Sequence, residues 1–214
     1  MDHLVQIILI GVILTNLVVL GSHPLNTCIR AVALQGVALG VLPLFLHGRE
    51  WSYHTFLISF MVIGLKGFLI PILLFRAIRE AVVRKEQEPL IGFTASLILG
   101  GGLVGLGFAV SSGLPLPAEI KSSLLVPVAL STLMIGLLVI VTRVKILTQT
   151  LGYLMLENGI FAFGLILTKE LPWLIEMGVS LDIFAGIFVM GTLMGHIHEE
   201  FNTLSVRKLS SLKG

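Results

Sequence analysis

Charged residues are scarce in this chain. Asp, Glu, Lys and Arg make up 12% of its 214 residues, about half the share in a typical soluble domain, whereas hydrophobic residues make up 56%. The formal net charge is only +2, and the basic residues are scattered, which argues against a nucleic-acid-binding protein. With a mean hydropathy of +1.02, the chain is expected to be an integral membrane protein that lies mostly within the bilayer.

Cysteine is almost absent as well. Cys28 is the single one, which excludes an internal disulfide and a cysteine-built metal cluster. The sequence also lacks a glycine-rich phosphate loop, an activated serine or cysteine arrangement, and a haem ligand set. We therefore expect a chain without catalytic residues that holds no metal and no cofactor of its own.

Apolar runs close to the length of a spanning helix, roughly 20 residues, follow one another along the chain. The seven runs lie at about 4–21, 28–46, 54–77, 91–112, 122–142, 149–167 and 174–197. The first run lacks a basic start and a small-residue cleavage site, so we expect it to be retained as a helix. The pattern predicts an all-α polytopic membrane protein with about seven transmembrane helices. We interpret residues 1–214 as one membrane domain, with helices one to four in 1–120 and three more in 121–214.

The basic residues predict the orientation of these helices. With the C-terminus in the cytoplasm, ten basic residues fall in cytoplasmic segments and three in external ones. The cytoplasmic set is Arg30, Arg76, Arg79, Arg84, Lys85, Arg143, Lys145, Arg207, Lys208 and Lys213; the external set is Arg49, Lys121 and Lys169. Because Lys and Arg concentrate in cytoplasmic loops, seven spans with an external N-terminus fit the sequence best.

Three charged residues fall well inside the apolar runs: Lys66, Glu157 and Asp182. Each costs at least ~2.5–3.5 kcal/mol in the bilayer, so each is expected to face protein or water. A buried carboxyl or amine can be charged or neutral according to its surroundings, and such a group can carry a proton. Lys66 is followed by Pro71, for which we expect a local kink.

Each of these residues has a structural alternative. Glu157 could be protonated or hydrogen-bonded to a neighbouring helix, Lys66 could form an ion pair with a partner's carboxylate, and Asp182 could cap a helix near the interface. Asn158 points about 100° away from Glu157 around the helix and is expected to form an interhelical hydrogen bond.

Two histidines form a weaker signal at the end of the last apolar run. In "HIHEE", His196 and His198 are two residues apart and point to different sides of a helix, which disfavours a metal site. We interpret them as a hydrated helix end or as a point of proton entry from the cytoplasm.

The C-terminal third, from about Pro127, resembles the K-type subunit of respiratory complex I and the C subunit of Mrp-type antiporters. In that pattern a basic pair precedes the middle helix, a glycine follows, an asparagine lies six residues later, and the last helix has an acid four residues before a glycine. The matching positions are Arg143, Lys145, Gly152, Asn158, Asp182 and Gly186. The family's middle-helix glutamate falls at Leu154, whereas Glu157 lies three residues later, about 4.5 Å along the axis.

The whole chain, with its extra N-terminal helices and its "GLKGFLIP" segment, resembles component E of hydrogenase-4. This resemblance implies a multi-pass subunit in a prokaryotic cell membrane, within a formate-hydrogenlyase-type or other group 4 nickel–iron hydrogenase complex. It implies antiporter-like and small membrane subunits as partners, and soluble large and small subunits that hold the nickel–iron centre and iron–sulfur clusters. The implied role is proton translocation or its coupling to redox chemistry. A subunit of an Mrp-type cation/proton antiporter and a purely structural membrane subunit are the alternatives.

Overall fold

The computed structural model describes residues 2–46, 53–80, 90–114, 124–167 and 191, nearly all of them helical. The elements in chain order are α1 (Asp2–Gly21), α2 (Leu25–Leu46), α3 (Tyr53–Val62), the π-helix η1 (Ile63–Leu69), α4 (Ile70–Glu80), α5 (Phe93–Gly113), α7 (Leu125–Thr142) and α8 (Ile146–Leu167). The expected all-α architecture is therefore confirmed for the described part of the chain.

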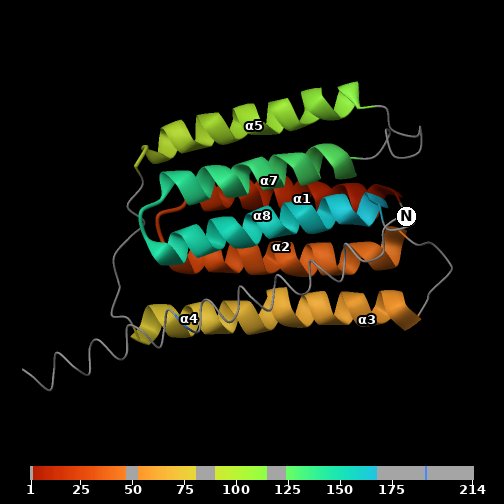
Figure 1. Cartoon of the computed structure of the whole chain (residues 1–214), viewed down its shortest axis with the longest axis horizontal. Helices are drawn as coiled ribbons and strands as arrows, with labels where there is room; N and C mark the ends of the chain where they lie inside the picture. The colour runs from red at the N-terminus through yellow and green to blue at the C-terminus, as the bar shows by residue number, and fades with distance from the viewer. Residues whose placement is uncertain (1, 47–52, 81–89, 115–123, 168–190, 192–214) are drawn as a thin grey trace, which may run out of the picture.

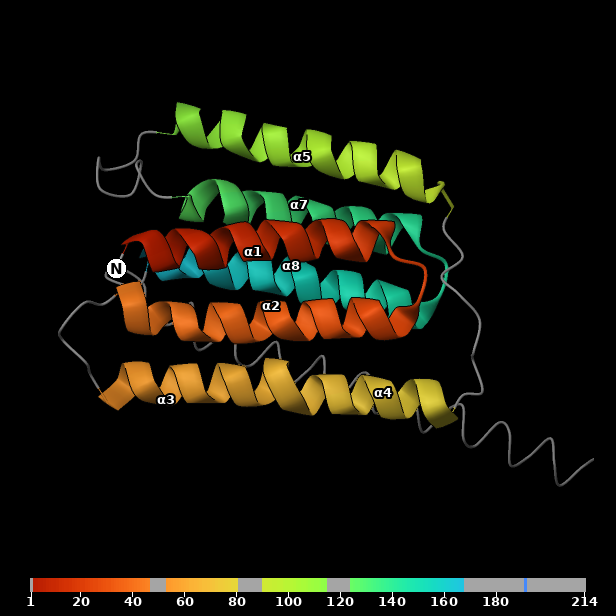
Figure 2. The same cartoon turned by 180° about the vertical axis from the view of Figure 1, so that it is seen from behind.

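The helices run side by side along one direction (Figures 1 and 2). Helices α1, α2, α7 and α8 form the middle of the bundle, and α7 and α8 pack together as a hairpin. Helix α5 covers α1 and α7 on one side, while the continuous rod of α3, η1 and α4 lies against α2 on the other. Helices from the predicted C-terminal part thus pack directly against helices from the N-terminal part.

Five segments within the described ranges are long and apolar enough to cross a membrane. They are His3–Gly21, Leu25–Leu46, Thr55–Arg79, Phe93–Gly113 and Leu125–Thr142, and they coincide with the first five predicted spans. Helix α8 occupies the sixth predicted span, 149–167. The seventh, 174–197, lies outside the described residues except for Gly191. The chain is a multi-pass membrane protein, and the count of seven spans and the orientation stay predictions.

The outer surface is apolar, as expected for helices in contact with lipid. Phe60 is 79% exposed and Ile98 is 71% exposed, although each lies within a candidate span. In water such side chains would be buried; in a bilayer the surrounding acyl chains are as apolar as they are. Burial of apolar side chains therefore cannot hold this bundle together by itself, and close packing and interhelical hydrogen bonds take a larger share.

Glycines allow the closest helix contact in the bundle, between α7 and α8. A Cβ on Gly136 of α7 would lie 2.8 Å from the carbonyl oxygen of Gly152, and one on Gly159 would lie 2.5 Å from the backbone nitrogen of Leu133. Neither gap can hold a methyl group. The two backbones are therefore in direct contact, and this contact fixes the position of α8 along the axis of α7.

The sequence predicts a local kink near Pro71, and the structure has a π-helix directly before this proline. The helix is π-helical over Ile63–Leu69, and the backbone N–H of Ile70 donates to the carbonyl of Leu65, five residues earlier. Pro71 follows directly, in the first turn of α4. Because a π-helical turn contains one more residue than an α-helical turn, it changes the direction in which the later side chains point. Lys66 stands at the middle of this segment.

We predict that Gly136→Ala destabilises the protein and that Gly101→Ala does not. Both replacements gain helix propensity of about 1 kcal/mol, but only the first forces α7 and α8 apart, at a cost of about 1–3 kcal/mol. Gly101, on α5, has no atom within 4 Å of its Cβ position and is the matched control. Unfolding by denaturing detergent in mixed micelles measures both variants, and equal stabilities would contradict the backbone contact.

Candidate functional site

Lys66 lies in the interior of the bundle and is only 5% exposed. The backbone of η1 approaches α2 closely here because Gly36 has no side chain; a Cβ on Gly36 would lie 2.5 Å from the Cβ of Lys66. Gly40, one turn further along α2, leaves room for Ile63 in the same way. Small residues four apart allow two membrane helices to pack closely. This contact holds Lys66 at the centre of the bundle.

The Lys66 amine begins a chain of hydrogen bonds that crosses five helical elements. Its Nζ donates to Oδ1 of Asn158 on α8 at 3.0 Å. Nδ2 of Asn158 donates to Oε1 of Gln35 on α2 at 3.0 Å, and Nε2 of Gln35 donates to Oδ1 of Asn16 on α1 at 2.7 Å. Nδ2 of Asn16 donates to the Thr132 hydroxyl on α7 at 2.8 Å. We call these five residues the polar chain.

Every hydrogen bond in the polar chain runs in the same direction, away from Lys66. A protonated lysine only donates, so it requires the carbonyl oxygen of Asn158 rather than its NH₂ group. The NH₂ group of Asn158 then faces Gln35 and requires a carbonyl oxygen there, and the same condition passes on to Asn16. The donor at Lys66 therefore sets the orientation of three amides on three different helices.

Burial makes these bonds important for stability. Asn16, Gln35, Thr132 and Asn158 are all at most 1% exposed, so water does not satisfy them at the surface. A buried amide that loses its partner costs roughly 1–3 kcal/mol. Each residue of the polar chain thus needs its neighbours, and the hydrogen bonds help to specify how the five elements pack.

Glu157 lies beside the polar chain on α8 and is 1% exposed. Leu154, one turn earlier, is also buried, so a side chain at either position points into the protein. On the same helix, the ring of Phe161 lies 5.6 Å from Nζ of Lys66 and contributes a cation–π contact. One stretch of α8 therefore brings an acid, an amide and an aromatic ring to the protein interior near the buried lysine.

The described part of the chain offers no metal site. No group of three or more His, Cys, Asp or Glu side chains comes together within the described residues. An amine, neutral amides and a single carboxyl are poor ligands for a nickel–iron centre or an iron–sulfur cluster, which need thiolates. What the described site shows is a set of buried hydrogen-bonding groups around an amine.

Comparison with known proteins identifies the family. No family model and no solved structure matches the chain. It is 31% identical over 204 residues to an uncharacterized protein of Mycobacterium tuberculosis, which covers 95% of this chain and 93% of that protein. It is 30% identical over 164 residues to hydrogenase-4 component E of Escherichia coli K12 and equally to that of Shigella flexneri, covering 77% of this chain and 73% of theirs. The chain belongs to the hydrogenase-4 component E family.

In this hydrogenase-4 component E relative, the structure brings together part of the predicted site. Lys66 and Asn158, taken from the sequence as separate candidates, are hydrogen-bonded to each other, and Asn158 makes the interhelical bonds expected of it. Glu157, which precedes Asn158 in the sequence, is buried as well. The other candidates, Asp182, His196 and His198, lie outside the described residues, and their placement stays a prediction.

Sequence analysis missed Gln35, Asn16 and Thr132. All three are neutral, whereas the site residues predicted from the apolar runs are charged, apart from Asn158. A signal was present: each is a hydrogen-bonding side chain within an apolar run, and Gln35 directly precedes the close-packing segment "GVALG", Gly36 to Gly40. Which helix each amide would face could not be read from one sequence, because the partners come from positions 19 to 123 residues away.

We predict energetic coupling between Asn16 and Gln35. Asn16→Leu and Gln35→Met each leave a neighbour's polar group unpaired, so each lowers the free energy of unfolding by roughly 1–3 kcal/mol. Once one bond is broken, the second replacement loses less, so the double variant departs from additivity by roughly 0.5–3 kcal/mol. Unfolding in mixed micelles measures the cycle.

Thr15→Val combined with Gln35→Met is the matched control. The Thr15 hydroxyl is adjacent in sequence to Asn16 but donates to the carbonyl of Val12 within its own helix. This pair should therefore be additive. Additivity for Asn16 with Gln35 as well would show that the polar chain does not act as a unit.

Proposed function

We propose that this protein is a membrane subunit of a hydrogenase-4-like, group 4 nickel–iron hydrogenase complex, and that it takes part in proton translocation or in coupling redox chemistry to ion movement. The single observation that carries the second part is the hydrogen bond between buried Lys66 and Asn158. Family membership supports the first part, because the named relatives are components of hydrogenase-4.

The chemistry of the polar chain limits how it can act. Amide groups neither gain nor lose protons at ordinary pH, so a proton cannot pass along Asn158, Gln35 and Asn16. Lys66 and Glu157 can each exchange one proton, but neither side chain spans the roughly 30 Å of the bilayer core. The proposed path therefore includes water and groups from neighbouring subunits, and the amides serve to position Lys66.

Coupling in this proposal acts through charge. When redox chemistry in the complex changes the charge at a nearby site, the balance between charged and neutral forms at Lys66 and Glu157 shifts, because charges interact strongly where water is scarce. The soluble large and small subunits are proposed to hold the nickel–iron centre and iron–sulfur clusters. Antiporter-like and other small membrane subunits are the proposed neighbours of this chain.

We predict that Lys66→Gln, Glu157→Gln and Asp182→Asn lower proton translocation by the assembled complex about tenfold or more, as expected when a proton-exchanging group is removed. Hydrogen chemistry with an artificial dye should be preserved, because it occurs in the soluble subunits. Proton uptake into inverted vesicles and dye reduction measure the two activities. Arg79→Gln, at an exposed position on α4, is the matched control.

Unaltered translocation in all three variants would contradict a proton-transfer role. If the same variants release neighbouring subunits, the buried charges serve assembly, as in a purely structural subunit. Gentle purification distinguishes the remaining alternative: a subunit of an Mrp-type cation/proton antiporter would co-purify without nickel or iron.

A further inference from the structure

A second buried cation lies at the end of the bundle, away from the polar chain. Arg143 follows α7, precedes α8, and is 1% exposed. Its Nη2 donates to the carbonyl of Leu20 in the last turn of α1 at 3.0 Å. Its guanidinium carbon lies 5.0 Å from the centre of the Phe93 ring, the first residue of α5. Arg143 thus ties together the ends of α1, α5 and α7.

These contacts leave part of the Arg143 guanidinium without a partner. Nε and Nη1 are buried and have no hydrogen-bond partner among the described residues. The Phe93 ring covers a face of the group, whereas N–H donors point outward in its plane. Burial lowers the pKa of Arg143 from its ordinary value, opposed by the nearby Cys28 sulfur, but a guanidinium stays protonated in proteins. A permanent positive charge with two donor nitrogens that lack acceptors favours a bound anion.

Two further donors without partners lie at the same end. Ser96, in the first turn of α5, and Thr148, in the first turn of α8, have buried hydroxyls without a hydrogen-bond partner in the described part of the chain. Two hydrogen bonds connect the segments at this end of the bundle. The Leu90 N–H, shortly before α5, donates to the Thr142 carbonyl at the end of α7, and the Gln149 side chain of α8 donates to the Arg143 carbonyl. Two long helices thus begin beside Arg143, and helix N-termini favour anions.

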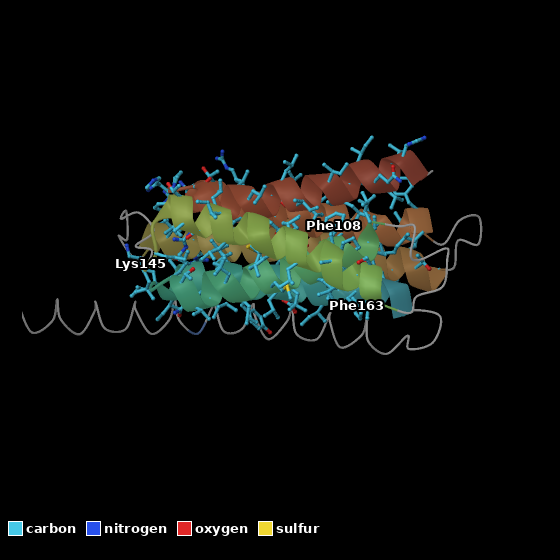
Figure 3. All side chains as sticks on the ribbon, turned by 90° about the horizontal axis from the view of Figure 1, so that it is seen from above. Phe108, Lys145 and Phe163 are labelled. Atoms are coloured by element: carbon cyan, nitrogen blue, oxygen red, sulfur yellow. The ribbon has the colours of Figure 1, made fainter. Side chains whose placement is uncertain are left out.

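Basic residues gather among the described residues at this end. Figure 3 shows Lys145 at this end of the bundle, with Phe108 and Phe163 toward the other. Arg30 on α2 and Arg79 on α4 are exposed cations at the same end. Candidate spans terminate at this end, so we expect it to lie near the lipid headgroups, where exposed cations attract anionic lipid.

We propose that this end of the bundle holds the phosphate group of an anionic phospholipid, with Nε and Nη1 of Arg143 as the principal donors beside the N-terminus of α5. The phosphate supplies the acceptor oxygens and the negative charge that Arg143 lacks. Phe93 holds the guanidinium plane, and the bond to Leu20 directs its remaining edges toward the ligand. The site is separate from the polar chain, and its ligand is a lipid phosphate bound by Arg143.

Native mass spectrometry of the full chain in a neutral detergent tests this site with short-chain phosphatidylglycerol. We expect retained phosphatidylglycerol in the wild type and binding about tenfold weaker in Arg143→Gln, as for a lost charge-assisted hydrogen bond. Arg30→Gln removes one exposed charge without touching the guanidinium and should cost much less than this. Arg30 is exposed at the same end and is the matched control. Arg143→Lys keeps the charge and should recover only part of the affinity.

A measurement on the wild type covers the case in which Arg143→Gln does not fold. In phosphatidylglycerol vesicles, dipolar dephasing between lipid phosphorus and arginine side-chain nitrogen should detect a guanidinium in direct contact with phosphate. No such signal would overturn the proposal, as would equal lipid binding in wild type and Arg143→Gln. Inorganic phosphate that binds as tightly as the lipid would overturn the lipid source. If the wild type retains no lipid and Arg143→Gln loses partner subunits from the complex, the proposal is overturned, because a partner's carboxylate then binds Arg143 instead.

Discussion

The hydrogen bond from Lys66 to Asn158 is the interaction on which the interior of this bundle depends. A charged amine in the bilayer core is strongly unfavourable unless it has a polar partner. Asn158 supplies that partner, and in doing so it engages both of its own polar groups. The requirement then passes to Gln35 and Asn16, each of which must offer an oxygen on one side and an NH₂ group on the other. One buried charge thus constrains side chains on five helical elements.

Backbone packing makes this arrangement accessible. Gly36 admits the backbone of η1 at Lys66, and the π-helical turn sets the direction in which the lysine points. On the other side, the glycine contacts between α7 and α8 hold Asn158 at a fixed height. Because apolar burial contributes little between helices in lipid, such close contacts and the polar chain together account for how the helices choose their neighbours.

Much of the fold followed from the sequence, because a bilayer demands long apolar helices and their lengths are visible in composition. The buried charges were visible for the same reason, as Lys66 and Glu157 interrupt apolar runs. The π-helix at Lys66 was not predicted, since Pro71 indicates only a break in regular hydrogen bonding. Nor was the pairing of Lys66 with Asn158, which lie 92 residues apart and meet only through tertiary packing.

The same limit applies at the cytoplasmic end that the basic residues predict. From the sequence, Arg143 is a loop cation that indicates orientation and matches the basic pair of the K-type pattern, and neither interpretation requires burial. In the structure its guanidinium lies over the ring of Phe93, the first residue of α5, and donates to the carbonyl of Leu20 in the last turn of α1. A basic residue that predicts membrane orientation can therefore also be buried between helices, and only the structure shows which basic residues are buried.

The most direct test of the central claim is ¹⁵N NMR of the side-chain amides of the full chain in lipid nanodiscs, compared between the wild type and Lys66→Met. If the Lys66 amine sets the direction of the polar chain, its removal shifts the amide signals of Asn158, Gln35 and Asn16 together. A shift confined to Asn158, with the signals of Gln35 and Asn16 unchanged in Lys66→Met, would contradict the account.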